Sequence, residues 1–297
     1  EPIPNMAQNI TEIKVMMAAG FSNMNKNAVT ERPQIPQYRL GQDIFCPEYK
    51  VTDLNTVTGY LYRGWIIDVL MTDDGRIVVC DYINESLLIG NSDGSSVHTI
   101  PLEKQPWTVT AVNDSTVAVT LPNKHTVEVY DINRRTKLRS IKVPGRCYGI
   151  TSINNMLAVG GQRKMWMIDQ YTGQVVNTIK TDHMYTRLHT SGERLFSYER
   201  LLLGSQTTII TCYNQSGEKL FTTTPLPSYI RGVTTLQDGS LYVACCDDKV
   251  YHLSSDGQSY APVDTIQPCG HTLMMYNTRQ QKLITGNGSS LRIYHHI

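Results

Sequence analysis

The feature that most constrains this chain is a short apolar segment that returns at regular spacing from residue 77 onward. Its copies are "IVVCD" from Ile77, "VAVTL" from Val117, "LAVGG" from Leu157, "LFSYE" from Leu195, "LYVAC" from Leu241 and "LITGN" from Leu283. Successive copies are 40, 40, 38, 46 and 42 residues apart, as the differences between those positions show. A polar turn such as "DDGR" or "QDGS" precedes each copy, and such turns favour hairpins. The spacing therefore indicates stacked supersecondary units.

Each copy has the same kinds of neighbour along the chain. An apolar segment such as "IIDVLM" precedes the turn, and a third segment such as "TVEVYDI" follows the copy. A second polar turn, for example "YTGQ" or "SDGQ", then leads to a fourth segment such as "KLRSIKV". Four short antiparallel strands in about 40 residues are typical of one β-propeller blade. We therefore predict an all-β fold, a six-bladed β-propeller with four-stranded antiparallel blades.

The last repeat lacks one strand. It stops at "SLRIYHHI" with its third strand, which would leave an unpaired edge prone to aggregation. A spare segment before the first repeat, "KVTDLNTVTGYLY" from Lys50 to Tyr62, can supply the outer strand. We predict that this N-terminal strand pairs with the last blade and closes the ring.

The N-terminal segment differs from the repeats in composition. Residues 1–46 contain Pro33 and Pro36, many Asn and Gln residues, and no alternation of apolar and polar residues. "TEIKVMMAAG" from Thr11 to Gly20 carries the start and stop signals of one short helix. We therefore divide the chain into an irregular segment or linker, 1–46, and a propeller, 47–297.

Composition restricts the compartment and the class of protein. Formal net charge is +1, and 40% of the residues are hydrophobic, as in a globular domain. The seven cysteines form no CxxC motif, which predicts reduced thiols and a cytoplasmic protein. No apolar run approaches the roughly 20 residues that span a bilayer, so we expect no membrane association.

Five glycosylation sequons run against the cytoplasmic interpretation. They begin at Asn9, Asn84, Asn113, Asn214 and Asn287. Most fall in predicted turns, where Asn and Ser are favoured in any case. We interpret them as turn residues, and glycosylation remains the alternative.

The sequence gives little sign of catalysis. The loops after the second strands offer three carboxylates and one amide, from Asp81, Glu199, Asp247 and Asn287. Calcium is bound by several oxygen ligands, mostly carboxylates, so a metal site stays an alternative, but Asp81 and Asn84 are better explained as residues that cap a turn. No HExxH, GxSxG or Gly-rich phosphate loop occurs. We expect no metal, no cofactor and no enzymatic activity, and we keep a metal-dependent, lactonase-like hydrolase as the least favoured alternative.

The loops that join one repeat to the next are richer in binding residues. These joints read "RGWII", "QPWTV", "RCYGI", "YTRL", "YIRGV" and "CGHTL", and we call the rim that they form the joint face. Aromatic and Arg side chains are enriched at binding hot spots. The predicted partner-binding residues are Trp65, Trp107, Tyr148, Tyr185, Arg187, Tyr229, Arg231 and His271. Packing between blades is the alternative role, and the sequence favours it for Trp107 and Tyr148.

One basic run offers a second kind of site. The run "NRRTKLRSIKVPGR" contains Arg134, Arg135, Lys137, Arg139, Lys142 and Arg146. RNA-binding proteins need such local basic surfaces. Charged outer strands also protect sheet edges, and this role is favoured. RNA binding through the run is therefore the alternative hypothesis.

Two repeats resemble a known propeller family. "DDGRIVVCDYINESLLIGNSDG" and "RGVTTLQDGSLYVACCDDKVYHLSSDG" resemble the NHL type of repeat. "EKQPWTVTAVNDSTVAVTLPNKHTVEVYDI" and "RCYGITSINNMLAVGG" are similar to the C-terminal propellers of tripartite-motif-like proteins of invertebrates, especially molluscs. The resemblance covers about residues 50–297 and implies a non-enzymatic module that binds a protein partner or, in some relatives, RNA. Any ubiquitin-ligase activity would need a RING domain, whose Cys/His pairs this chain lacks, and oligomerisation would need a coiled coil outside it.

Overall fold

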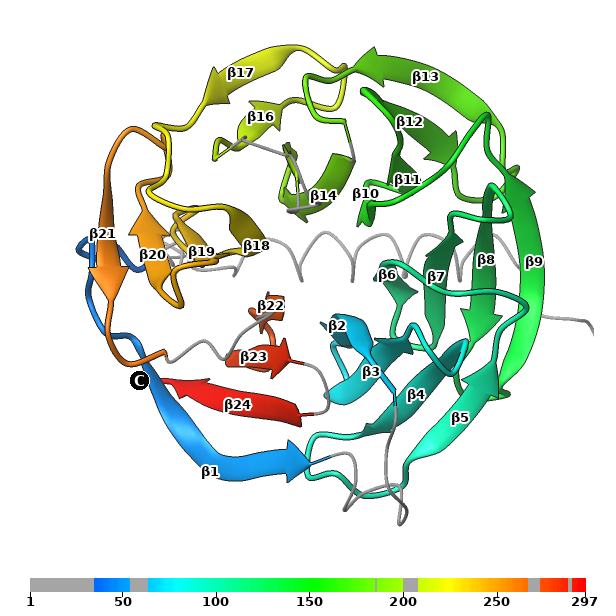
Figure 1. The fold of residues 1–297 in the computed structure, drawn as a ribbon, viewed down its shortest axis with the longest axis horizontal. Helices are drawn as coiled ribbons and strands as arrows, with labels where there is room; N and C mark the ends of the chain where they lie inside the picture. Colours follow the sequence, from blue (N-terminus) through cyan, green and yellow to red (C-terminus); the bar gives the residue numbers. More distant parts are fainter. Residues whose placement is uncertain (1–34, 54–63, 185, 200–207, 267–272, 288–289) are drawn as a thin grey trace, which may run out of the picture. The chain divides into compact units, whose positions relative to one another are not determined.

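The computed structural model describes residues 35–53, 64–184, 186–199, 208–266, 273–287 and 290–297. The chain divides into two compact units, Glu1–Pro36 and Gln37–Ile297. Nearly all of the first unit, including the predicted helix from Thr11 to Gly20, lies outside the described residues. The second unit is a ring of six four-stranded antiparallel sheets, as predicted (Figure 1).

Each blade has one strand at the centre of the ring and three that follow it outward (Figure 1). The innermost strands are β2 (Ile66–Met71), β6 (Val109–Asn113), β10 (Ile150–Ile153), β14 (Thr186–Ser191), β18 (Ile230–Thr235) and β22 (Leu273–Asn277). The second strands are β3 (Arg76–Asp81), β7 (Thr116–Leu121), β11 (Met156–Gly160), β15 (Arg194–Glu199), β19 (Leu241–Cys245) and β23 (Lys282–Asn287). The third strands are β4 (Ser86–Asn91), β8 (Thr126–Asp131), β12 (Lys164–Asp169), β16 (Thr211–Tyr213), β20 (Val250–Leu253) and β24 (Ser290–His296). The outer strands are β5 (His98–Pro101), β9 (Thr136–Lys142), β13 (Val175–Lys180), β17 (Lys219–Thr222), β21 (Tyr260–Val263) and β1 (Phe45–Asp53). Blades 1 to 5 begin at β2, β6, β10, β14 and β18, and blade 6 contains β22, β23, β24 and β1.

The inner strands are apolar on both faces because each blade is packed between two others. On β3, Val78 and Cys80 join a cluster shared with blade 2, whereas Ile77 and Val79 join a cluster shared with blade 6. Alternate side chains of a strand point to opposite faces of its sheet, so one strand serves two cores. The described residues form six such clusters, one at each junction between neighbouring blades. This arrangement explains why the repeating segment has no polar face.

The ring is closed by an N-terminal strand on blade 6, as predicted. β1 pairs antiparallel with β24, with Phe45 opposite His296 and Asp53 opposite Ser290. The strand begins at Phe45, five residues before the predicted segment that starts at Lys50. Phe45 is fully buried against Tyr242 and Tyr276, so the first residue of the strand is an apolar anchor. Pro47 is tolerated because β1 is the outermost strand, where a missing N–H breaks no interior ladder.

Local hydrogen bonds fix the turn after β3. Asp81 is fully buried, and its carboxylate accepts hydrogen bonds from the backbone N–H and the side-chain amide of Asn84, at 3.1 and 2.6 Å. It also accepts one from the backbone N–H of Trp65, at 3.3 Å. The predicted capping role of Asp81 and Asn84 is confirmed. The same carboxylate holds the joint before β2 against the turn after β3.

The described part of the chain contains neither a disulfide bond nor a helix that could cross a membrane. All six described cysteines are free thiols, and the four that lie within β3, the joint before β10, β16 and β19 are buried. Burial raises the pKa of the Cys212 thiol to about 11. No helix in the described ranges has the length and hydropathy needed to cross a bilayer.

Candidate binding site in the central channel

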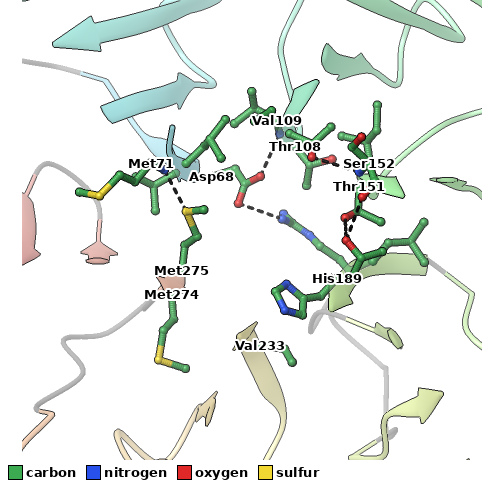
Figure 2. A pocket seen from close by; sticks show the side chains of 18 of the residues that line it. Asp68, Met71, Thr108, Val109, Thr151, Ser152, His189, Val233, Met274 and Met275 are labelled. Atoms are coloured by element: carbon green, nitrogen blue, oxygen red, sulfur yellow. Dashed lines mark hydrogen bonds and ion pairs between the residues drawn. The ribbon is translucent and has the colours of Figure 1, made fainter. Parts of the chain in front are cut away.

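The six innermost strands enclose a cavity of about 260 Å³ (Figure 2). Its wall comes from β2, β6, β10, β14, β18 and β22, together with Tyr198 of β15 and residues next to the strands. Every innermost strand starts at a joint loop, so the first residues of each strand lie toward the joint face. Asp68 and Arg187 belong to that end of the channel, whereas Asp73 and Asn277 belong to the other.

A ring of hydrogen bonds joins each blade to the next around this cavity. The Asp68 carboxylate accepts from the Val109 N–H at 2.9 Å, and Thr110 Oγ1 accepts from the Ser152 N–H at 3.2 Å. Thr151 and Thr190 share a hydroxyl hydrogen bond of 2.7 Å between blades 3 and 4 (Figure 2).

The remaining junctions are closed in the same way. His189 Nε2 lies 2.8 Å from Thr235 Oγ1, and Thr234 Oγ1 accepts from the Tyr276 N–H at 2.8 Å. Met275 Sδ lies 2.9 Å from the Met71 nitrogen, between blades 6 and 1 (Figure 2). The polar residues of these apolar strands therefore serve to connect neighbouring blades.

Arg187 lines the cavity but takes no part in this ring of hydrogen bonds. Only 3% of its surface is exposed, and its Nη1 lies 3.7 Å from Oδ1 of Asp68, which comes from the opposite blade. This separation makes an ion pair but is too long for a hydrogen bond. Its Nε and Nη2 atoms are buried and have no hydrogen-bond partner among the described residues. Buried polar groups nearly always have partners, so this guanidinium is a group that requires explanation.

Trp107 supplies part of the environment of Arg187. The guanidinium carbon lies 5.7 Å from the centroid of the Trp107 ring, within range of a cation–π interaction. Trp107 itself makes edge-to-face contacts with Tyr82 and Tyr148, with centroids 6.1 and 5.9 Å apart. An aromatic cluster thus supports the cation from one side.

His189 is a neutral member of the channel wall. Burial lowers the pKa of His189 from its ordinary value of 6.5 to about 4. The side chain is therefore uncharged at neutral pH. Among the residues that line the cavity, the charged groups at pH 7 are Arg187, Asp68 and Asp73. Asp73 is paired with Arg279, at 3.5 Å, at the far end of the channel.

The structure separates the eight residues that the sequence assigned to partner binding. Trp65 is 40% exposed at the joint face, and Tyr229 and Arg231 are partly exposed there. Arg231 Nε lies 3.0 Å from the sulfur of Cys246. Tyr148 is 5% exposed and Trp107 is partly buried, so both pack between blades. Arg187 faces the channel, and Tyr185 and His271 lie outside the described residues.

The basic run follows the outer strand β9 from one rim to the other. Arg134 and Arg135 are exposed in the turn before β9, and Lys142 and Arg146 are exposed at its far end. Arg139 Nη1 donates to the Tyr171 carbonyl at 2.6 Å. Lys137 forms ion pairs with Glu103 and with the fully buried Glu128. These interactions hold two of the six cations against the protein itself.

Lys137 shares its acidic partners with Lys124. Both ammonium groups contact Glu103 and Glu128, and they lower the pKa of Glu103 to about 2. Tyr130 donates a hydrogen bond of 2.5 Å to Glu128, and burial together with this contact raises the pKa of Tyr130. The cluster stabilises blade 2 and reduces the positive charge that β9 presents to solvent.

The carboxylates considered for a metal are dispersed. Asp81 caps its turn, and Asp247 accepts a hydrogen bond of 2.6 Å from Tyr251. The side chains of Glu199 and Asn287 lie outside the described part of the structure. Within that part, no three His, Cys, Asp or Glu residues are grouped as metal ligands would be.

Asp68 and His189 belong to the channel, and the sequence reasoning above did not select them. Each is a polar residue within an otherwise apolar inner strand, "IIDVLM" for Asp68 and "TRLHTS" for His189. Ionisable side chains are rarely buried without a partner, so this pattern is the signal that could have identified them. Their partners come from other blades, which local sequence does not show.

Comparison with known proteins establishes the fold. No family model matches the chain, and no curated protein matches it in sequence. Among solved structures, RRP9 WD40 repeats superpose with a TM-score of 0.65 and 10% identity, over 86% of this chain and 100% of that one. The Neurospora crassa Pan2 WD40 domain gives 0.59 and 10%, over 77% and 74%. Kuenenia stuttgartiensis hydrazine synthase gives 0.60 and 17%, over 75% and 73%.

These neighbours include WD40 domains and an enzyme, so the likeness concerns the architecture and not the chemistry. The resemblance to NHL-type and tripartite-motif-like proteins is not confirmed by any of these matches. The chain from Gln37 to Ile297 is a six-bladed β-propeller with WD40-like structural neighbours.

Proposed function

We propose that this propeller is a non-enzymatic interaction module that binds a protein partner on its joint face. The observation that carries the proposal is a set of large apolar side chains exposed on that face. Trp65 is 40% exposed before β2, Ile83 is 55% exposed in the turn after β3, and Met184 is 41% exposed before β14. Apolar side chains and Trp above all are the anchors of protein interfaces.

Backbone contacts hold the Trp65 and Ile83 segments together. The Trp65 carbonyl accepts a hydrogen bond of 2.9 Å from the Tyr82 N–H, one residue before Ile83. The Asp81 carboxylate accepts from the Trp65 N–H. A rigid surface loses little conformational freedom on binding, which favours affinity. Tyr229 and Arg231 extend the same rim on blade 5.

Charge favours a protein over RNA at this face. The net charge of the chain is +1, and the channel behind the joint face contains Asp68 beside Arg187, the one cation among its described lining residues. A phosphate backbone requires a surface with excess positive charge. Of the exposed cations of the basic run, Arg134 and Arg135 lie on the opposite rim, and Lys142 and Arg146 lie at the end of β9 nearer the joint face. RNA binding by this run is retained as an outcome of the test below.

The sequence resemblance gives the proposal a finer form. In a tripartite-motif-like protein, the joint face would recognise the substrate of a ubiquitin ligase, and a RING domain elsewhere would supply the ligase chemistry. The propeller would then determine which protein is modified.

Site-specific photo-crosslinking tests the proposal. A benzophenone amino acid replaces Ile83 on the joint face in one variant and Tyr171 in another. Tyr171 is 70% exposed in the turn between β12 and β13, on the opposite rim, and is the matched control. We expect one partner protein to be crosslinked from position 83, with or without RNase treatment. The control at position 171 should not crosslink it. Trp65→Ala should abolish the crosslink from position 83. Crosslinks that appear equally at both positions, or that disappear with RNase, would overturn the proposal.

A further inference from the structure

We propose that the central channel contains a carboxylate-binding site built on Arg187, which receives one acidic group of the protein partner. This inference rests on the proposed function, since it names the chemistry of the group that enters the channel. Arg187 is a buried cation whose contact with the carboxylate of Asp68 is longer than a hydrogen bond.

The unpartnered atoms of Arg187 define the geometry of the ligand. Nη1 faces Asp68, and Nε and Nη2 have no partner among the described residues. Nε and Nη2 lie on the same edge of the guanidinium, where their N–H groups point in parallel. This edge matches the two oxygens of a carboxylate, which accept two parallel hydrogen bonds. The existing Asp68 contact, at 3.7 Å, does not use this edge.

The energetics of burial favour such a ligand. A guanidinium that is 3% exposed has lost its water, and a single ion pair beyond hydrogen-bond distance returns little of that loss. The Trp107 ring offsets a further part from one side. Two charge-assisted hydrogen bonds to a carboxylate would complete the coordination. Arg187 is also one of the residues that line the cavity.

Charge and size select a monoanion over larger ligands. Arg187 is the one cation among the described lining residues, and Asp68 already opposes it. With Arg187 and Asp68 counted together, one carboxylate brings the net charge to −1, whereas a phosphate dianion brings it to −2. The cavity of about 260 Å³ is smaller than the pockets that hold drug-sized ligands, roughly 300–1,000 Å³. It accommodates an acidic side chain or a chain terminus.

In the structure, Nε and Nη2 of Arg187 expose almost no surface. A ligand therefore reaches them when the guanidinium turns toward the cavity, and this turn exchanges part of the Asp68 contact for the new carboxylate. Asp68 thus competes with the ligand. Asp68→Asn should strengthen binding, because the amide keeps an acceptor for the Val109 N–H and removes the competing charge.

Small probes test the site without any partner protein. Wild-type protein labelled with ¹⁵N-arginine is titrated with propionate, with propionamide and with inorganic phosphate, and the Arg187 Nε–H signal is followed. We expect a saturable shift with propionate and none with propionamide. Arg187→Lys keeps the charge but loses the paired N–H donors of the guanidinium, and should weaken propionate binding by about tenfold or more. Asp68→Asn should strengthen propionate binding severalfold. Absence of a saturable propionate shift in the wild type, or tighter binding of phosphate, would overturn the proposal even if the Arg187 variant failed to fold.

Three short peptides distinguish the sources of the carboxylate. One is a capped Gly-Glu-Gly, one a capped Gly-Gln-Gly, and one a Gly-Gly-Gly with a free carboxyl end. Binding of the first alone assigns an acidic side chain, binding of the third alone assigns a chain terminus, and binding of the Gln peptide as strongly as the Glu peptide contradicts the site. Since these probes do not report on Ile83 or Trp65, the channel site and the joint-face interface can fail independently.

Discussion

Ile179 of blade 3 lies directly against Gly217 in the turn between β16 and β17 of blade 4. A Cβ atom added at Gly217 would lie 2.4 Å from Cγ1 of Ile179, and the glycine has a φ of +86°. Gly173 lies against Ile141 of blade 2 in the same way, although less closely. The glycine of the second turn therefore allows one blade to rest on the outer strand of the preceding blade.

Gly217→Ala should destabilise the propeller more than Gly192→Ala. Gly192 also has a positive φ, +56°, but nothing lies within 4 Å of its added Cβ. We expect Gly192→Ala to cost about 1 kcal/mol from backbone strain, and Gly217→Ala to cost about 1–3 kcal/mol more from overpacking. Urea denaturation of both variants measures the difference, and equal losses would show that the contact with Ile179 is unimportant.

Phe45→Ala should open the closed ring. The side chain is fully buried and makes edge-to-face contacts with Tyr242 and Tyr276. Loss of a buried Phe costs about 3–5 kcal/mol in free energy of unfolding. Cys46→Ala, at the next and exposed position of β1, is the matched control and should change the denaturation midpoint little. An unchanged midpoint for Phe45→Ala would mean that β1 does not contribute to closure.

Glu128→Ala should be costly, and Glu103→Ala should not. Glu128 is fully buried and contacts Tyr130, Lys124 and Lys137. Its removal leaves the buried Tyr130 hydroxyl without its acceptor, which costs about 1–3 kcal/mol. Glu103 contacts the same two lysines from solvent, where ion pairs contribute little. Thermal unfolding of the two variants compares them, and a similar loss in both would contradict the assigned burial.

His189 should make the propeller less stable as the pH falls from about 7 to about 4. Its pKa in the folded protein is about 4, below the ordinary value of 6.5, so the unfolded chain binds more protons between these two values. Stability therefore decreases as pH is lowered through this window, by up to about 1.4 kcal/mol per pH unit. His189→Gln, which can keep the hydrogen bond to Thr235, should flatten this part of the stability profile. A profile identical to that of the wild type would contradict the assigned neutral state.

The architecture was accessible from the sequence because each repeat carries its own local signals. The turn before Ile77 and the capping pair Asp81 and Asn84 are encoded within a few residues of one another. Ring closure was accessible by counting strands. The start of β1 at Phe45 could not be predicted, because Phe45 is held by Tyr242 and Tyr276, which are far away in the sequence.

The channel was less accessible for the same physical reason. Arg187 was selected as a rim residue by its type, yet its environment is set by Asp68 and Trp107 on two other blades. Lys137 read as one member of a basic run, although Glu103 and the buried Glu128 neutralise it. Charge patterns along the chain do not show which charges meet across a closed ring.

The pairing of β1 with β24 also determines when the ring can form. The two strands come from opposite ends of the propeller sequence, and Ile297 donates a backbone hydrogen bond to Ile44 at 2.9 Å. Each blade can fold from local hairpins, but the sixth cannot be completed until its two distant segments meet. Contacts between distant residues are slow to form because the intervening chain must be ordered first. The final step of folding is therefore expected to be the seating of β1, after the five other blades are in place.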